Sequence, residues 1–128
     1  EGLKAVHVYQ SRHSRRQLMG LTPGNEVADA ETVHPIVRVH PESARKALYI
    51  NPIRIDRIID MEDGDTLELL DGLLAHATAE RHEYRHVWEM GDFVMWDNRS
   101  LLHKANGDYD MSQTRYLYRV MLQGDRPR

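Results

Sequence analysis

Cysteine is absent from the 128 residues of this chain, so disulfides, thiolate zinc sites and cysteine nucleophiles are excluded. Long apolar runs are also missing, and we therefore expect neither a membrane span nor a signal peptide. Basic residues are not in excess, because 17 Lys and Arg stand against 20 Asp and Glu. A general nucleic-acid-binding surface needs such an excess, so we expect no nucleic-acid partner, although a small basic pocket for an anionic metabolite remains compatible.

The length and composition that remain are those of an ordinary globular protein. A chain of 128 residues suits one domain with one modest core. The sequence opens without methionine in what reads as a structured region, and we expect it to be a piece of a longer protein. A cytoplasmic location is the default expectation.

The first half of the sequence predicts a helix and a β-hairpin. Apolar residues at helical spacing predict a helix over residues 2–19, followed by a loop rich in turn formers over residues 21–32. Two short apolar runs, residues 36–39 and 47–50, predict antiparallel strands. Turn-forming residues at 41–43 would connect them.

The second half predicts one helix followed by strands. Asp65 and Glu68 have capping-box spacing, which predicts a helix start and a helix over residues 65–79. Its buried stripe is expected to be Leu67, Leu70, Leu74 and Ala77. Four strands are expected after it, with a tight turn at 89–92 joining the first two: residues 84–88, 93–96, 101–104 and 115–122. The fold class predicted is therefore mainly β with flanking helices.

The last predicted strand places two arginines on one face. Side chains alternate along a strand, so Arg115 and Arg119 share a face, roughly 13 Å apart, and Tyr116 and Tyr118 take the other, under a helix. If the arginine face lines a barrel, each buried cation needs an anion. Two interpretations stay open: pairing with Asp, Glu or solvent, and binding of an anionic ligand.

His103 follows two leucines in the run LLHK. A histidine in such a run is usually a hydrogen-bonded core residue, yet neutral imidazole is also the commonest metal ligand. Beside two arginines it is compatible with a non-haem iron site that binds a chelating dianion. Two carboxylates are interpreted structurally: Glu42 lies in the hairpin turn after His40, and Asp97 fixes a turn by bonding backbone amides. Arg99 is interpreted as a structural ion pair with Asp97 or a neighbour.

Several segments together resemble the C-terminal half of the TauD/TfdA family of Fe(II)- and 2-oxoglutarate-dependent dioxygenases. They are LKAVH, HPIVRVHPESARKALYIN, LLAHAT, YRHVWEMGDFVMWDNRSLLHKANGDYD and RYLYRVMLQGDRP, which cover nearly the whole chain. The resemblance implies a double-stranded β-helix, the cupin-like jelly roll. Residues 1–128 would be the C-terminal portion of a single dioxygenase domain.

The resemblance also implies roles for single residues. His103 would be the distal iron ligand, Arg115 would bind the far carboxylate of 2-oxoglutarate, and Arg119 would bind the primary substrate. The implied cofactor is Fe(II), with 2-oxoglutarate and O2 as cosubstrates, succinate and CO2 as products, and a small sulfonate or carboxylate as substrate. Homo-oligomers are common in the family. The spacing from His103 to Arg115 is one residue longer than in taurine dioxygenase, a member of this family.

One motif of the family is missing from the printed sequence. The iron site needs a His-x-Asp pair, which the family carries upstream of the matching region, and this chain contains none. We therefore expect the chain alone to be catalytically incomplete. Two other interpretations stay open: a non-catalytic jelly-roll module that binds an anion through its arginines, and an interaction module that docks to a separate N-terminal half.

Overall fold

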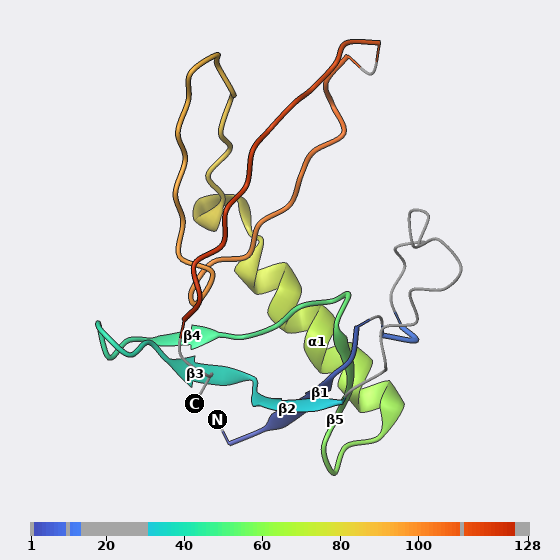
Figure 1. Cartoon of the computed structure of the whole chain (residues 1–128). Helices are drawn as coiled ribbons and strands as arrows, with labels where there is room; N and C mark the ends of the chain where they lie inside the picture. Colours follow the sequence, from blue (N-terminus) through green and yellow to red (C-terminus); the bar gives the residue numbers. More distant parts are fainter. Residues whose placement is uncertain (1, 10, 14–30, 111, 125–128) are drawn as a thin grey trace.

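The computed structural model describes residues 2–9, 11–13, 31–110 and 112–124. Its strands form two small sheets beside one long helix (Figure 1). The larger sheet has the order β2-β1-β5 and is antiparallel throughout: β1 is Lys4–His7, β2 is Thr32–Pro35 and β5 is Ile55–Ile58. The described part of the chain is thus β-rich, as the sequence predicted.

Strand β1 forms where the sequence predicted a helix. Ala5 and Val6 are buried, and Ala5 pairs with His34 on one side and Ile58 on the other. The helix prediction was wrong for residues 4–7, because two neighbouring strands satisfy the backbone here and override a weak helical period. The part of that prediction over residues 14–19, and most of the predicted loop, lie outside the described residues.

The predicted hairpin is confirmed, with small changes at its ends. Strands β3 (Val37–Val39) and β4 (Lys46–Leu48) are antiparallel. The turn between them is closed by hydrogen bonds in which the backbone N–H of His40 donates to Arg45 and that of Ala44 donates to His40. The His-Pro-Glu sequence therefore lies in a turn, as expected.

Helix α1 (Asp63–Ala77) begins two residues before the predicted start. Glu62 is the N-cap, and its carbonyl accepts the backbone N–H of Thr66, so the predicted capping box at Asp65 was wrong. Asp65 lies instead in the first turn, where a carboxylate favours the helix dipole. Of the predicted stripe, Leu70, Leu74 and Ala77 pack on the core together with Leu69 and Leu73, whereas Leu67 is 39% exposed.

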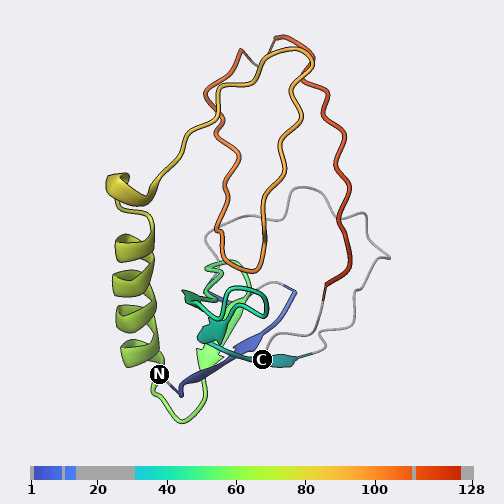
Figure 2. The same ribbon diagram turned by 90° about the vertical axis from the view of Figure 1, so that its left-hand side faces the viewer.

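The core lies between α1 and the two sheets. Five buried residues from the sheets and their connections form it: Ala5, Ile36, Ile50, Ile55 and Ile58. Helix α1 runs along one side of the sheets, as both views show (Figures 1 and 2). Within the described ranges, no helix has both the length and the apolar character needed to cross a lipid bilayer.

The segment after the short 3-10 helix η1 (Glu80–His82) departs most from prediction. The described residues of 84–110 and 112–124 run as long open excursions from the sheets and contain no hydrogen-bonded strand (Figures 1 and 2). The tight turn at 89–92 is present, with Gly91 at a positive φ of 93°. Tyr116 and Tyr118 are 73% and 88% exposed, so the expectation that a helix covers them was wrong.

Candidate functional site

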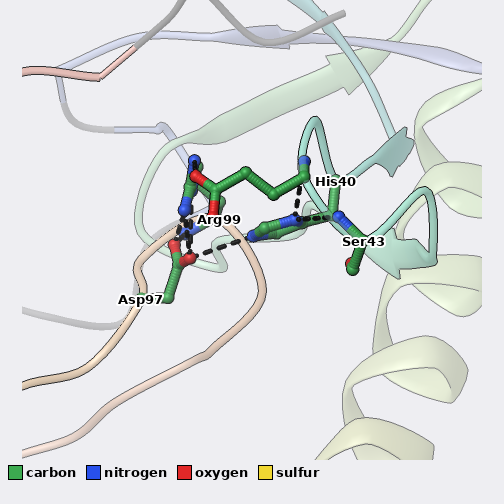
Figure 3. Close-up of polar contacts among 5 residues, drawn as sticks. His40, Ser43, Asp97 and Arg99 are labelled. Atoms are coloured by element: carbon green, nitrogen blue, oxygen red, sulfur yellow. Dashed lines mark hydrogen bonds and ion pairs between the residues drawn. The ribbon is translucent and has the colours of Figure 1, made fainter.

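The stretch from Trp96 to His103 is fastened at its start by a polar network. Oδ2 of Asp97 lies 2.9 Å from Nε2 of His40, which belongs to the turn between β3 and β4. The guanidinium of Arg99 binds the same carboxylate, with Nη2 2.6 Å from Oδ2 and Nε 2.9 Å from Oδ1. Figure 3 shows these side chains converging from two segments that lie far apart in sequence.

The turn itself confirms two sequence interpretations. Oδ1 of Asp97 accepts the backbone N–H of Arg99 at 2.8 Å, so this aspartate does fix a turn. Its carbonyl accepts the N–H groups of Ser100 and Leu101, both at 3.2 Å. Arg99 forms the expected ion pair with Asp97 and a second one with Glu42, at 2.9 Å. Both arginine contacts are structural in character.

The charges in this network stabilise one another. Hydrogen bonds from the Arg99 side chain, and then from His40, hold the pKa of Asp97 far below its usual range. Hydrogen bonds to Asp97 and Glu42 raise the pKa of Arg99 above its usual value. Asp97 is therefore a carboxylate and Arg99 a cation throughout the neutral range.

His103 lies in the segment that follows this turn. Its ring is 5.1 Å from the ring of Trp96, centroid to centroid, at an angle of 53°. Nε1 of Trp96 donates to Oδ1 of Asn98 at 2.8 Å, which fixes the indole relative to the turn. His103 itself is exposed, so the interpretation as a packed core residue is not what the structure gives. Trp96 is half-buried.

Arg115 and Arg119 are both exposed on the last excursion. The guanidinium of Arg115 lies over the ring of Tyr109, 5.2 Å from its centroid. Among the described residues, neither arginine has a carboxylate partner, and no hydrogen bond, ion pair or ring contact joins either one to His103. The structure places the three predicted site residues on neighbouring excursions without bringing them into one pocket.

The metal-ligating capacity of the described residues is incomplete. Across residues 2–9, 11–13, 31–110 and 112–124, no three His, Asp or Glu side chains are grouped closely enough to hold a metal ion. His103 thus provides one imidazole and lacks companion ligands in the described part of the chain.

The link between His40 and Asp97 was missed by sequence reasoning. The two residues are 57 positions apart, and each has an ordinary local explanation as a turn residue. A half-buried ring cluster of His7, His34 and Tyr49 was missed as well, because its members come from three separate segments. No spacing rule connects residues that only tertiary structure brings together.

Comparison with known proteins matches the chain to one family and several curated enzymes. The family model described as taurine catabolism dioxygenase TauD, TfdA family, matches residues 1–121. The chain is 35% identical over 138 residues to (S)-phenoxypropionate/alpha-ketoglutarate-dioxygenase of Sphingobium herbicidovorans, covering 98% of this chain and 47% of that protein.

Two further relatives give similar values. The alpha-ketoglutarate-dependent 2,4-dichlorophenoxyacetate dioxygenase of a Burkholderia species is 37% identical over 131 residues, covering 100% of this chain and 42% of that enzyme. An alpha-ketoglutarate-dependent sulfate ester dioxygenase of Pseudomonas putida is 40% identical over 97 residues, which cover 76% of this chain and 32% of the enzyme. The chain therefore spans less than half the length of each of these curated relatives.

Proposed function

Because the chain belongs to the TauD/TfdA family, we propose that it is the C-terminal portion of a 2-oxoglutarate-dependent dioxygenase domain. The observation that carries the proposal is the family match itself. It extends over residues 1–121 and so includes His103, Arg115 and Arg119. Relatives that act on phenoxypropionate, 2,4-dichlorophenoxyacetate and sulfate esters support a small anionic substrate.

The residues of this chain fit one part of an iron site, with His103 as one of its three protein ligands. His103 is exposed, and its imidazole is available as a ligand. The other two ligands, the family's His-x-Asp pair, would come from sequence that is not part of the printed chain. Fe(II), if held by all three ligands, would supply the chemistry by which O2 oxidises both organic molecules: one oxygen atom goes into succinate as 2-oxoglutarate loses CO2, and the other goes into the hydroxylated substrate.

The chain's own residues would bind and orient the two organic molecules. Arg115 offers a planar pair of N–H donors to the far carboxylate of 2-oxoglutarate, a geometry that a lysine does not reproduce. Arg119, four residues further on, would bind the sulfonate or carboxylate of the substrate and so place its reacting carbon. The exposure of both guanidiniums, with no carboxylate partner in the described part of the chain, supports their availability for anionic ligands.

The jelly roll belongs to this proposal as well. Large apolar side chains along residues 84–122 are exposed, among them Tyr84, Phe93, Val120 and Leu122. Extended segments with exposed apolar residues gain most by pairing with further strands. We infer that these segments become strands of a jelly roll when the remaining half of the domain is present. A homo-oligomeric state and a cytoplasmic location stay predictions.

An anaerobic titration with Fe(II) and 2-oxoglutarate tests the function. The visible charge-transfer band of the metal–2-oxoglutarate complex should appear with the domain that carries the His-x-Asp pair, and should disappear in its His103→Ala variant. In Arg115→Ala, the 2-oxoglutarate concentration needed for half the band should rise by about tenfold or more, as expected for loss of a bidentate ion pair. His82→Ala, at an exposed histidine outside the site, is the control.

The same titration separates the alternatives. A band that persists in His103→Ala would remove this histidine from the metal site. An unchanged 2-oxoglutarate requirement in Arg115→Ala would reassign that arginine. If the chain gives no band without the His-x-Asp half, it is an incomplete part of the enzyme, and anion binding that survives without metal would favour the non-catalytic module.

A further inference from the structure

We propose that His40 is a positioning residue, a hydrogen-bonded link of one fixed tautomer that holds the 97–100 turn and thereby sets the place of His103. The link joins the hairpin turn of the β3–β4 sheet to a segment that has no strand pairing in its described part. The significance of His103 as a metal ligand rests on the proposed function. The link between His40 and Asp97 and the ring contact between Trp96 and His103 do not.

The hairpin side of the link fixes which ring nitrogen carries the proton. Nδ1 of His40 lies 3.3 Å from the backbone nitrogen of Glu42 and 3.2 Å from that of Ser43, and both of these N–H groups donate to it (Figure 3). A ring nitrogen that accepts hydrogen bonds must do so with its lone pair, and it therefore bears no hydrogen. In the neutral ring the proton must therefore reside on Nε2.

The Asp97 side of the link uses that proton. Nε2 of His40 is 2.9 Å from Oδ2 of Asp97. Because Asp97 is an ionised carboxylate, it can only accept this hydrogen bond, and Nε2 donates. The bond is charge-assisted, and charge-assisted bonds are about twice as strong as neutral ones. The His40 side chain is only 12% exposed, which reduces competition from water. The imidazole thus bridges two turns, accepting from one and donating to the other.

A second bridge runs parallel to the first. Nη1 of Arg99 reaches Oε1 of Glu42 at 2.9 Å, while Nη2 holds Oδ2 of Asp97. Glu42 is exposed, so this bridge contributes little by itself. Its effect is to hold the carboxylate of Asp97 in the orientation that His40 needs. The two bridges converge on one oxygen atom, Oδ2 of Asp97 (Figure 3).

The position of His103 follows from the turn. Asp97 begins the turn, and its carbonyl accepts the backbone N–H groups of Ser100 and Leu101. Trp96, which precedes the turn in sequence, contacts the ring of His103, which follows it. A ring contact across a turn fixes His103 relative to Trp96, and Trp96 directly precedes the aspartate that His40 holds. Movement of His40 would therefore move the turn and both rings with it.

Two substitutions of His40 separate its two hydrogen bonds. Asparagine can place an oxygen near the position of Nδ1, so His40→Asn keeps the acceptor for the hairpin turn and loses the donor to Asp97. Glutamine can place an N–H near the position of Nε2, so His40→Gln keeps the donor to Asp97 and loses the turn acceptor. The same two changes at His82, which lies in η1 outside the link, are matched controls.

The test is made by NMR on the full chain without metal, with the His-x-Asp half present where it is needed for folding. Long-range 1H–15N spectra of the imidazoles should show His40 protonated on Nε2 alone at pH 7. The ring-to-ring cross-peaks of Trp96 and His103 should persist in His40→Gln and in both His82 variants, and should be lost in His40→Asn. A proton on Nδ1 of His40, or cross-peaks that respond equally to Asn and Gln, would overturn the proposal.

Hydrogen exchange by mass spectrometry gives a second, independent measurement. The amides of the 97–100 turn, and that of Leu101, should exchange about tenfold faster in His40→Asn than in His40→Gln. This is the amount expected for one net hydrogen bond of about 1.4 kcal/mol. Faster exchange in His40→Gln would mean that the hairpin turn, and not the link to Asp97, is what matters. That result would also overturn the proposal.

The positioning role and the dioxygenase function fail in different ways. If the apo protein shows the link but His103→Ala leaves the charge-transfer band unchanged, the function is wrong and the link stands. If Fe(II) and 2-oxoglutarate bind through His103 while His40→Asn and His40→Gln bind Fe(II) equally well, the positioning role is wrong. With both correct, His40→Asn should bind Fe(II) about tenfold more weakly than His40→Gln, as for other residues that orient metal ligands.

Discussion

His7 shows how burial controls a single ionisable ring in this fold. Its imidazole stacks on Tyr49 at 5.5 Å and meets His34 edge-on at 5.1 Å. Burial, and then the neighbouring His34, lower the pKa of His7 to about 4. The guanidinium of Arg38 lies over the ring of Tyr49, 5.2 Å from its centroid. A proton on His7 is opposed by burial and by the neighbouring His34.

Acid should destabilise the protein through His7. In the unfolded chain the ring of His7 binds a proton below about pH 6.5, whereas in the folded protein it does so only below about pH 4. The unfolded state thus holds more protons across this window, and the free energy of unfolding should fall as the pH is lowered through it. In His7→Phe, which keeps a flat ring, this fall should be shallower. Denaturant titrations between pH 7 and pH 4 measure the effect.

His82→Phe is the control for this prediction, since His82 is exposed. It should leave the pH dependence of unfolding unchanged. A slope that is the same in wild-type, His7→Phe and His82→Phe proteins would mean that His7 is not held neutral by its surroundings. His34 would then be the next ring to test in the same cluster.

Single residues were predictable where their partners are close in sequence. Asp97 was predicted to bond backbone amides of its turn, and Arg99 to pair with Asp97 or a neighbour; both predictions are confirmed, by contacts that span two positions. His40 and Asp97 were each placed in a turn, but their mutual contact was not predicted. A pairing across 57 residues depends on how two sheets and a loop pack, which no local pattern contains. The roles of His103, Arg115 and Arg119 stay predictions.

Helix α1 contains a buried polar group that the fold leaves unsatisfied. Thr66 is fully buried, and its Oγ1 has no hydrogen-bond partner among the described residues. A buried hydroxyl without a partner costs stability, whereas a methyl group of the same shape does not. Thr66→Val should therefore raise the free energy of unfolding by about 1 kcal/mol. Chemical denaturation of the two proteins measures the difference.

The same change at the other end of α1 should have the opposite sign. Oγ1 of Thr78, the C-cap residue, donates to the carbonyl of Leu74 at 2.9 Å. Thr78→Val removes this bond and should lower stability by about 0.5–1 kcal/mol. Because threonine and valine are both β-branched, equal effects of the two substitutions would show that hydrogen bonding of the hydroxyl group does not decide them.

Two neighbouring isoleucines, one at the end of strand β5 and one directly after it, have opposite environments. Ile58 is 1% exposed and belongs to the core, whereas Ile59, directly after the strand, is 37% exposed. Ile58→Ala should cost about 3 kcal/mol, because it leaves a cavity in a core of few residues. Ile59→Ala should cost less than about 1 kcal/mol. Urea unfolding compares the two variants, and Ile58→Val, expected to cost about 1 kcal/mol, gives a graded point if the alanine variant does not fold.

Comparable losses at Ile58 and Ile59 would contradict this assignment of the core. The isoleucine pair also shows why the element itself was hard to predict. Residues 53–64 contain isoleucine, charged residues and an acidic break in close succession, so neither a helical nor a strand period is sustained. The strand forms because β1 offers it a partner, and β2 and β5 in turn are the partners that make a strand of residues 4–7.

The molecule as a whole divides into a packed part and an extended part. Buried residues come from the sheets, their connections and α1, while every described residue of 84–124 is exposed or half-buried. Alternating patterns in this segment correctly marked its turn at 89–92 but not hydrogen-bonded strands. A strand needs a neighbour, and for the last excursions the sequence of this chain does not show which segment that neighbour is.

The difference between the two parts should appear in backbone hydrogen exchange. Amides of β1, β5 and α1 lie in hydrogen-bonded elements that pack on the core and should exchange slowly. Residues 84–88 and 115–122 are exposed, except for the half-buried His86, and lack strand pairing. In the chain alone we therefore expect their amides to exchange faster by about a hundredfold or more. Adding the half of the domain that carries the His-x-Asp pair should slow exchange in these two stretches and leave β1 and α1 nearly unchanged. Protection of residues 115–122 in the isolated chain would contradict the open arrangement, and the absence of any slowing with the other half present would remove the exposed segments as its docking surface.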